Sequence, residues 1–410
     1  MNSELRKISD QIIAGAIKAV LPDEAVKRAL NGMEFTGRVF LVAAGKAAWQ
    51  MANAADKCLG NKIQKGVVIT KYDHVMGPIS DFTLVEAGHP IPDENSFSGT
   101  QTAIDLVSSL NSDDTVLFLL SGGGSALFEK PLISGEELSD ITGQLLACGA
   151  DIVEINTIRK RLSEVKGGKF ATICEPAHVF SIVLSDILGD PLDMIASGPA
   201  CPDSSTCEDA MKIVDKYNLK LSQKARELLA VETPKELSNV TTQITGSVRE
   251  LCSAVEKECV KYGYTPVMLT DQLCCHAREA GSFLSSIAKT HTSDGRKMAY
   301  IAGGETVVHL TGHGKGGRNQ ELALAASVGI SGLNNAAVFS FGSDGTDGPT
   351  DAAGGYVDAD TYRELKDMGI EVFDVLLEND SYNALKKTGG LVITGPTGTN
   401  VNDVSVLLIG

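Results

Sequence analysis

Short apolar runs alternate with amphipathic segments of helical length along the first half of the chain. The runs VFLVAA (39–44), GVVIT (66–70), FTLVEA (82–87), TVLFLL (115–120) and VFSIVL (179–184) are each followed by a loop and then by helix-like sequence. Short runs rich in β-branched and aromatic residues are typical of buried strands. Because strands that alternate with helices form parallel sheets covered by helices, this half predicts an α/β domain.

A second series of apolar runs follows a polar break. The segment ETPKELSN (232–239) is polar and contains a proline, as linkers often do. A chain of 410 residues exceeds the size at which one core usually keeps growing, so two domains are expected. We place them at residues 1–236 and 237–410. The predicted strands of the second domain are VTTQITG, TPVMLT, KMAYIAG, TVVHLTG, AAVFSFG and VSVLLIG.

Composition limits the partners. The chain is 43% hydrophobic and 21% charged, and its 36 Lys and Arg against 52 Asp and Glu give a net charge of -16. This balance disfavours a nucleic-acid or anionic membrane surface. No apolar run approaches the roughly 18 residues of a membrane span, and the N-terminus reads as an amphipathic helix, neither signal peptide nor anchor.

Cysteine usage points to a reducing compartment. The nine cysteines are scattered, odd in number and free of any CxxC pair, so we predict buried thiols and a cytoplasmic protein. Cys274, Cys275 and His276 are adjacent, but one cluster without a second ligand pair is more often core packing than zinc. We assign no zinc site.

The loop FGSDGTDGPTDAAG (341–354) brings Asp344, Asp347 and Asp351 together directly after an apolar run. Ligands of open α/β sheets bind outside the carboxyl ends of the strands, so this acidic loop suggests bound cations or polar groups held by carboxylates. A solvated turn is the alternative, since Asp and Gly are ordinary turn residues.

Similar loops follow other predicted strands. Lys46 stands between a strand and a helix, a position that favours an anion. The loop Ser121-Gly122-Gly123-Gly124-Ser125 has almost no side chains, so its N–H groups could approach a phosphate or carboxylate, although a tight turn is equally compatible. Asp186 and Asp190 follow a third strand.

In the second half, polar, glycine-rich loops also follow predicted strands, at 303–305, 312–319 and 395–403. Loops that converge at one site would offer carboxylates, backbone donors and cations together. Such a mixture suits phosphoryl transfer, which needs Mg²⁺ held by carboxylates, cations on the migrating charge and a group that orients the attacking hydroxyl. The cations would come from Lys46, Arg159, Lys160 and Arg318.

A competing signal is GHGKGG (312–317), which matches the dinucleotide-binding pattern G-x-G-x-x-G. The pattern is weak here, because other phosphate loops share the spacing and Asp344 follows Gly317 by 27 residues instead of about 20. No GxxxxGK[ST] and no G-x-S-x-G occur, which argues against a Walker-type NTPase and an α/β-hydrolase. We interpret His89 as a turn residue. A third alternative is a non-catalytic protein that binds a small acidic metabolite. Such a protein would need only the cations and the glycine loops, so the cluster of carboxylates would have no role.

Nine motifs occur in a fixed order along nearly the whole chain: AAGKAAWQMA, EAGHPIPDENS, LSGGGSAL, NTIRKRLSEVKGGKFA, LSDILGDPLDMIASGP, GGETVV, GKGGRNQELALAAS, SDGTDGPTDAAG and TGPTGTNVND. Together they closely resemble the glycerate 2-kinase family with a C-terminal MOFRL domain. The resemblance implies a Rossmann-like N-terminal domain with a parallel sheet, a smaller α/β C-terminal domain with a mixed sheet, and an active site in the cleft between them.

The resemblance also implies an activity, the phosphorylation of D-glycerate to 2-phosphoglycerate with ATP and Mg²⁺. Some family members have been labelled hydroxypyruvate reductases, so an NAD(P)H-dependent hydroxypyruvate reductase is the alternative. The expected partners are D-glycerate and ATP, with no nucleic acid and no membrane. The expected assembly is a monomer or a homodimer.

The motifs of the family place candidate residues on this chain. Lys46, Arg318, Asp344 and Asn400 are the candidate catalytic or substrate-positioning residues. We expect Lys46 and Arg318 to neutralise the glycerate carboxylate and the migrating phosphoryl group, and Asp344 to orient or deprotonate the hydroxyl. Asp186 and Asp190 are the candidate Mg²⁺ ligands, although a metal carboxylate and a base carboxylate could be exchanged. The candidate substrate or phosphate ligands are Ser121, Gly122, Gly123, Gly124, Ser125, Arg159, Lys160, Gly316, Gly317 and Asn319.

Overall fold

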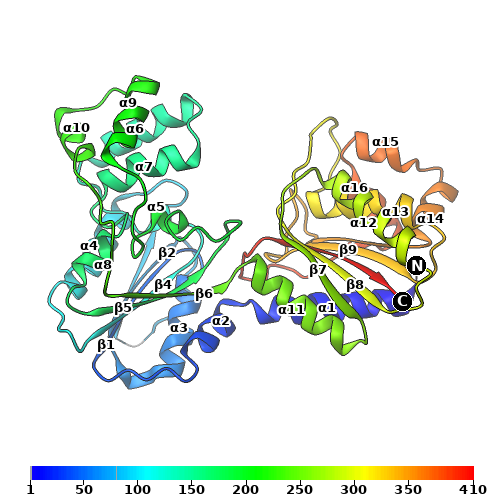
Figure 1. Cartoon of the computed structure of the whole chain (residues 1–410), viewed down its shortest axis with the longest axis horizontal. Helices are drawn as coiled ribbons and strands as arrows, with labels where there is room; N and C mark the ends of the chain where they lie inside the picture. Colours follow the sequence, from blue (N-terminus) through cyan, green and yellow to red (C-terminus); the bar gives the residue numbers. More distant parts are fainter. Residues whose placement is uncertain (1, 80) are drawn as a thin grey trace. The chain divides into compact units, whose positions relative to one another are not determined.

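The computed structural model describes residues 2–79 and 81–410, which form two compact units (Figure 1). The first unit comprises residues 25–184 and 190–245. The second unit comprises the segment up to Glu24, residues 185–189 and residues 246–410. Each unit is an α/β fold with its own six-stranded sheet.

The first unit contains a sheet with strand order β3-β2-β1-β4-β5-β6. Strand β1 pairs in parallel with β2 and β4, and the same sense continues from β2 to β3 and from β4 to β5. The five strands predicted for this half are therefore confirmed. The strand bounds are β1 Val39–Ala44, β2 Ile63–Lys71, β3 Phe82–Ala87, β4 Thr115–Leu120, β5 His178–Leu184 and β6 Val240–Gly246.

Helices cover both faces of this sheet (Figure 1). Val68 of β2 belongs to a buried cluster with α3, whereas the neighbouring Ile69 contacts Gly99 of α4. Successive side chains of a strand point to opposite faces, so α3 and α4 lie on opposite sides. The helices around the sheet are α2 Pro22–Leu30, α3 Ala48–Leu59, α4 Glu94–Val107, α5 Gly124–Leu127 and α8 Lys169–Ile173, with short 3-10 turns at Gly60–Lys62 and Ile195–Ser197.

Four further helices of the first unit pack into a separate cluster beside the sheet (Figure 1). Their shared core includes Leu145, Ile158, Val214 and Leu229, all of which are buried. Two of the helices begin with capping boxes, in which side chain and backbone satisfy each other's first-turn groups. These helices are α6 Gly135–Ala147, α7 Ile152–Leu162, α9 Cys207–Tyr217 and α10 Gln223–Leu229.

The second unit contains a mixed sheet with strand order β11-β10-β9-β12-β8-β7. Strands β7 and β8 are parallel, whereas β12 runs antiparallel between β8 and β9, and β10 is antiparallel to β9 and β11. A mixed sheet is what the family resemblance implied. The strand bounds are β7 Thr265–Leu273, β8 Met298–Gly304, β9 Ala336–Gly342, β10 Gly354–Asp358, β11 Leu391–Val392 and β12 Asp403–Ile409.

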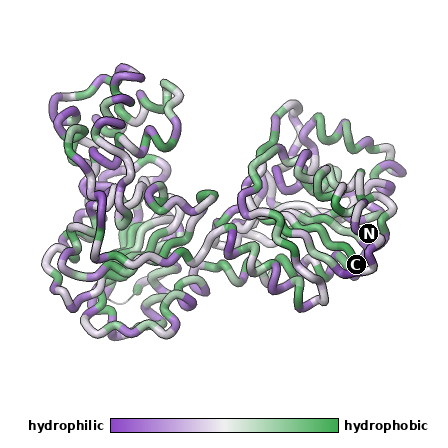
Figure 2. The backbone as a smooth tube through the Cα atoms, viewed as in Figure 1, coloured by the Kyte–Doolittle hydropathy of each residue, from purple (hydrophilic) through white to green (hydrophobic). Residues whose placement is uncertain are grey.

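The strands β8, β9 and β12 of the second sheet are buried on both faces and run through the middle of the unit (Figure 2). Val406 of β12 packs in a core with α1 and α11, and the adjacent Leu407 packs in a core with α12 and α13. The near-continuous apolar sequence of these strands follows from this double burial. The helices are α1 Ser3–Ala19, α11 Val248–Lys261, α12 Ala277–His291, α13 Arg318–Ile330, α14 Thr361–Asp367, α15 Val372–Leu377 and α16 Ser381–Thr388.

The division between the units differs from the predicted boundary at residues 236 and 237. VTTQITG forms β6 at the edge of the first sheet, where Val179 N–H donates to Asn239 O and Ser185 N–H donates to Gly246 O. The chain therefore leaves the first unit after this strand. The N-terminal helix α1 packs against α11 of the second unit, because its apolar face completes that core.

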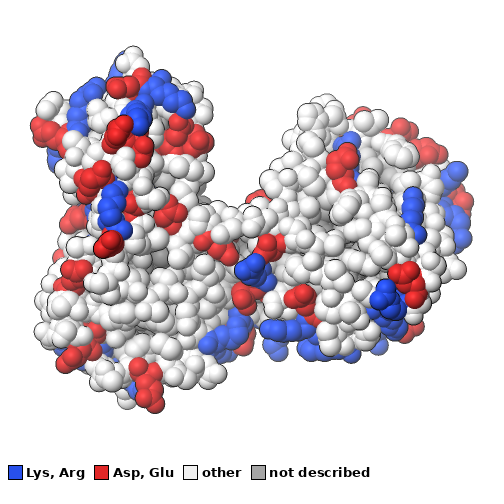
Figure 3. Space-filling view, viewed as in Figure 1, with Lys and Arg blue, Asp and Glu red and all other residues white. Residues whose placement is uncertain are grey.

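One predicted strand is wrong. TVVHLTG forms no strand, because within it only Val307 makes an isolated bridge, to His276. In the part of the chain that the structure describes, no helix is long and apolar enough to cross a membrane. Figure 3 shows acidic and basic side chains interspersed on the visible face, without a continuous basic surface there.

Candidate active site

In the first unit, the loops after β1 and β4 bind each other at the carboxyl ends of these adjacent strands. Lys46 N–H donates to Gly122 O over 2.9 Å, and Ala47 N–H donates to Ser121 Oγ over 3.0 Å. Gly45 has a φ of +126°, and a Cβ there would lie 2.2 Å from Ser121 Oγ, so only glycine fits. Lys46 and the glycine loop, residues 121–125, are thus neighbours, as predicted.

The glycine loop presents free backbone donors. The N–H groups of Gly122, Gly123 and Ser125 have no acceptor among the described residues, and all three residues are partly exposed. Gly123 has a φ of +86°, which turns the backbone into the left-handed region. Successive N–H groups in such a turn form a concave anion-binding surface. The exposed residue Lys46 lies beside this loop, with its Cγ close to Gly123.

His89 also lies against the glycine loop. Its Nε2 lies 3.1 Å from the position that a Cβ would take at Gly123, and Cγ of Lys46 lies 3.2 Å from the same position. Burial lowers the pKa of His89, and the positive charges of Lys46 and Lys71 lower it further, so the imidazole is neutral near pH 7. The interpretation of His89 as a mere turn residue overlooked its place just after β3, at the same sheet edge as Lys46.

The basic run at the end of α7 is turned inward. Arg159 Nη2 donates to Ser125 O over 3.0 Å and pairs with Glu129 at 3.3 Å, so Arg159 braces the glycine loop. Lys160 is 2% exposed, and its ammonium lies 3.1 Å from Asp203 Oδ1. The prediction of Lys160 as a phosphate ligand is therefore corrected, because a buried acid already neutralises it.

In the second unit, Arg318 is held by two carboxylates. Its Nε and Nη2 donate to Oδ2 and Oδ1 of Asp403 over 2.5 and 3.1 Å, and Nη1 pairs with Glu305 at 3.1 Å. Asp403 begins β12 and stands in register between Gly304 of β8 and Gly342 of β9. A bidentate pair of this kind fixes the plane of the guanidinium.

The surroundings of Arg318 are rich in negative charge. Burial raises the pKa of Asp403 to about 6, Arg318 opposes this shift, and the charges of Asp347 and Glu305 add to it. Burial lowers the pKa of Arg318, but the hydrogen bond and charge of Asp403 outweigh it and raise the pKa overall. The guanidinium therefore stays protonated, while Asp403 titrates just below neutral pH.

Asp344 approaches the same glycine as Asp403. Oδ1 of Asp344 and Oδ1 of Asp403 lie 3.3 and 3.2 Å from the position that a Cβ would take at Gly342. Thr346 donates to Asp344 from its N–H over 2.9 Å and from its hydroxyl over 3.1 Å, which fixes the half-buried carboxylate. Its oxygens keep lone pairs that can accept a further proton or hydrogen bond.

The segment before β12 supplies two amides. Asn400 is exposed, and its Oδ1 accepts the N–H of Asn402 over 3.4 Å. Asn402 is 5% exposed, and its Nδ2 donates to Asp186 O at 3.2 Å and to Glu305 at 3.5 Å. Its Oδ1 is buried without a donor among the described residues. Sequence reasoning chose Asn400 and missed Asn402, although Asn402 directly precedes Asp403.

At the start of α13, backbone N–H groups already bind a carboxylate of the same chain. Asp347 accepts the N–H groups of Asn319 and Gln320 over 3.2 and 2.9 Å, and a Cβ at Gly317 would lie 2.3 Å from Asp347 Cγ. The prediction that Gly316, Gly317 and Asn319 bind phosphate is therefore corrected, because a carboxylate already occupies this helix N-terminus. These residues fix the backbone of Arg318 instead.

The segment GHGKGG does not form a dinucleotide-binding turn. Gly314 N–H donates to Glu378 O over 2.7 Å, and a Cβ at Gly312 would lie 2.3 Å from the Cα of Glu378. These glycines let the segment pack on residues 378–381, and no strand leads directly into it. The geometry that a Rossmann fingerprint requires is absent here.

The two predicted metal ligands fall in different units, Asp186 in the second and Asp190 in the first. Among the described residues, no three His, Cys, Asp or Glu side chains are grouped to hold a metal ion. Oδ1 of Asp190 is buried without a donor, which fits a hard cation that prefers oxygen ligands. A Mg²⁺ ion would therefore need phosphate oxygens to complete its coordination.

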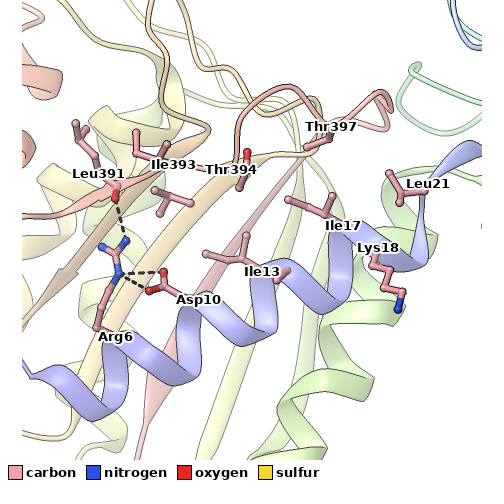
Figure 4. A pocket seen from close by; sticks show the side chains of 12 residues that line it. Arg6, Asp10, Ile13, Ile17, Lys18, Leu21, Leu391, Ile393, Thr394 and Thr397 are labelled. Atoms are coloured by element: carbon pink, nitrogen blue, oxygen red, sulfur yellow. Dashed lines mark hydrogen bonds and ion pairs between the residues drawn. The ribbon is translucent and has the colours of Figure 1, made fainter. Parts of the chain in front are cut away.

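A cavity of about 660 Å³ lies apart from these groups, between α1 and the segment after β11 (Figure 4). Arg6 pairs with Asp10 at its edge, and Ile13 and Ile17 line its floor. Thr397 forms part of its wall and donates its N–H to Asp344 O over 3.2 Å. A residue of the cavity wall thus holds the Asp344 loop through a backbone hydrogen bond.

Comparisons with known proteins agree with this architecture. Residues 8–230 match a family described as a domain of unknown function, DUF4147, and residues 298–403 match the MOFRL family. A D-glycerate 2-kinase from Thermotoga maritima is 54% identical over 99% of this chain and 98% of its own length. A glycerate 2-kinase from Pyrococcus horikoshii is 42% identical over the same shares. A putative hydroxypyruvate reductase from Agrobacterium vitis is 38% identical over 91% of this chain and 100% of its own length.

Solved structures share the whole fold. The crystal structure of glycerate kinase from Thermotoga maritima has a TM-score of 0.95 and 53% identity, covering 99% of this chain and 100% of that one. The fold, the loops at the strand ends and these relatives define a kinase. The chain belongs to the glycerate 2-kinase family with a C-terminal MOFRL domain.

Proposed function

We propose that the protein transfers the γ-phosphoryl group of ATP to the 2-hydroxyl of D-glycerate, with Mg²⁺, and yields 2-phosphoglycerate and ADP. The observation that carries the proposal is that Asp403, which fixes the Arg318 guanidinium, and Asp344 both approach Gly342 at the end of β9. A fixed cation next to a carboxylate with free lone pairs provides charge stabilisation and hydroxyl activation, the two needs of phosphoryl transfer. The names of the relatives support the substrate.

Lys46 and the glycine loop are assigned to the carboxylate of glycerate. Lys46 and the free N–H groups of the glycine loop offer only positive charge and donors, and the neutral imidazole of His89 can add one more donor. Such a set of donors and positive charge suits a bare carboxylate, because charge-assisted hydrogen bonds are stronger than neutral ones.

Asp344 and Arg318 are assigned to the chemistry. Asp344 accepts the proton of the 2-hydroxyl as the oxygen attacks the γ-phosphorus, and the bond from phosphorus to the bridging oxygen of ADP breaks. Arg318 neutralises charge on the transferring group. The side-chain amides of Asn400 and Asn402 help to position polar groups of the substrates. Arg318 cannot swing freely, since Asp403 holds it at two points.

A magnesium ion would be held by Asp190 or Asp186, and the buried Oδ1 of Asn402 is a further oxygen of the right kind. When bound, Mg²⁺ neutralises phosphate oxygens of the nucleotide. We also propose a cytoplasmic location, because the nine cysteines are scattered along the sequence without a CxxC pair, as in proteins of reducing compartments. The expectation that all of these thiols are buried is wrong, since Cys148 and Cys274 are exposed.

A coupled assay tests the proposal. Purified protein is given D-glycerate, ATP and Mg²⁺, and the product is converted by enolase alone or by phosphoglycerate mutase plus enolase. Signal with enolase alone is expected, because it identifies 2-phosphoglycerate. Signal only with the mutase would place the phosphoryl group on the 3-hydroxyl. NADH oxidation by hydroxypyruvate without ATP use would favour the reductase instead.

A further inference from the structure

A buried lysine lies directly beneath the glycine loop. Lys166 is fully buried, and its Nζ donates to Ser125 O over 2.8 Å, to Phe128 O over 3.0 Å and to Ala196 O over 3.5 Å. One ammonium therefore ties the end of the glycine loop to residues 190–198, the segment that begins with Asp190.

The same ammonium belongs to a charged cluster. Glu129 is fully buried and lies 3.6 Å from Lys166 Nζ and 3.3 Å from Arg159 Nη2. Arg159 donates to Ser125 O as well, so two cations converge on one carbonyl of the loop. Glu129 thus balances one of the two positive charges, and its Oε1 has no donor among the described residues.

The segment below the loop has an unusual backbone. Ala196, Ser197 and Gly198 have φ values of +51°, +60° and +65°, a left-handed run that alanine and serine rarely adopt. A Cβ at Gly124 would lie 2.8 Å from the Cβ of Ala196, so the two segments touch. The bond from Lys166 to Ala196 O therefore helps to hold a strained segment on which the glycine loop rests.

Such a cluster is poorly explained by stability alone. Burying an ammonium costs free energy, and replacing buried ion pairs by apolar side chains is often neutral or stabilising. The pKa of Lys166 is lowered to about 8, chiefly by burial and also by the charge of Arg159, and Glu129 opposes this shift only in part. Function is a better reason for a charge at this position.

We infer that Lys166 is a positioning residue that holds the glycine loop in the conformation whose free N–H groups bind the glycerate carboxylate. This inference rests on the proposed function, because it assigns a role within the same reaction. The ammonium does not touch the substrate. It acts through the carbonyls of Ser125 and Ala196, and so couples the substrate loop to the segment that carries Asp190.

The chain offers a matched control in Lys169. This largely buried lysine also donates to three carbonyls, those of Lys160 at 3.0 Å, Arg161 at 3.2 Å and Ser163 at 2.6 Å. Burial lowers its pKa to about 8 as well. Lys169 makes no hydrogen bond to the glycine loop, so its replacement reports the cost of losing a buried lysine at another place.

The test compares full-length Lys166→Met and Lys169→Met with the unchanged protein. We expect Lys166→Met to lower kcat/KM for D-glycerate by about 100-fold, the usual scale of a displaced binding group, chiefly through KM. Amide hydrogen exchange should accelerate in residues 121–128 and 194–198. Lys169→Met should change the denaturant midpoint while leaving KM and exchange in the glycine loop as they were.

Unchanged KM and unchanged exchange of the loop in Lys166→Met would overturn the inference, and so would equal effects in Lys169→Met. If Lys166→Met does not fold, Glu129→Gln provides the second variant, because it weakens the hold on Lys166 while keeping the shape. The KM for D-glycerate and the rate of amide exchange in the glycine loop should then both rise, as expected for Lys166→Met. A parent protein without kinase activity would overturn the proposed function, whereas exchange that responds only to Lys166→Met would still support the positioning role.

Discussion

Asp403 binds Arg318 through both carboxylate oxygens, joining the first residue of β12 to the first residue of α13. The two residues are 85 positions apart in the sequence. Because β12 stands between β8 and β9 at the centre of the sheet, the guanidinium is anchored to a rigid part of the unit. This anchoring makes the site sensitive to changes at Asp403 that leave Arg318 itself intact.

Arg318→Ala should lower kcat by about 100-fold, the usual cost of removing one donor that stabilises transition-state charge. Asp403→Asn should also lower kcat, because the amide keeps the size of the side chain but no longer fixes the cation by charge. Steady-state kinetics with both substrates measures the effect, and circular dichroism checks folding. Full turnover in Arg318→Ala would remove Arg318 from the proposed reaction.

The activity should fall in acid with a midpoint near pH 6. Burial raises the pKa of Asp403 from 3.8 to about 6, so protonation in this range weakens its pairing with Arg318. For stability the sign is opposite: the folded state binds this proton more tightly, so the contribution is complete below pH 3.8 and is lost as the pH rises through about 6.

A pH profile of kcat/KM checks this prediction. The acid limb should be present in the parent protein and absent from Asp403→Asn, which cannot titrate at this position. The same limb in both proteins would assign it to another group.

Gly317→Ala should destabilise the protein by about 1–3 kcal/mol, the usual cost of forcing an extra methyl group into a packed site. The new Cβ would lie 2.3 Å from Cγ of Asp347, which caps α13. Gly143→Ala is the control, because it is a helical glycine with nothing within 4 Å and should gain up to about 1 kcal/mol. Urea unfolding measures both, and equal midpoints would contradict the proposed close packing.

The sequence placed Lys46 and the glycine loop correctly, because the position of a loop at the end of a parallel strand follows from the order of the elements. The same rule correctly placed Asp344 after β9. These predictions needed no knowledge of side-chain direction. The family motifs then singled out Arg318 without showing what holds it.

The errors arose where a side chain's direction decided its role. Lys160 reads as a surface cation, but Asp203 lies 43 residues later and neutralises it in the interior. Gly317 reads as part of a phosphate loop, and only the folded chain shows that Asp347 already occupies the helix N-terminus. His89 reads as a turn residue and Asn402 was not singled out, because their contacts are with residues distant in sequence.

His89→Asn should raise KM for D-glycerate and leave kcat less affected, because the neutral imidazole is assigned to binding at the glycine loop. The asparagine is shorter and cannot place its amide where Nε2 lies, next to Gly123. His291→Asn on α12 is the control, since that partly exposed histidine contacts Asp294 instead of the glycine loop. Steady-state kinetics with varied glycerate distinguishes the two. An unchanged KM in His89→Asn would return His89 to the role of a turn residue.

Gly123→Ala tests the glycine loop most directly. The position has a φ of +86°, which costs an alanine about 1–2 kcal/mol, and the new Cβ would lie 3.0 Å from Cδ2 of His89 and 3.2 Å from Cγ of Lys46. Gly149→Ala is the matched control, because Gly149 has a similar φ of +74° but nothing within 4 Å. Both variants should lose similar stability in urea unfolding, and only Gly123→Ala should also weaken glycerate binding. Equal binding by the two variants would show that the loop conformation at Gly123 is not used by the substrate.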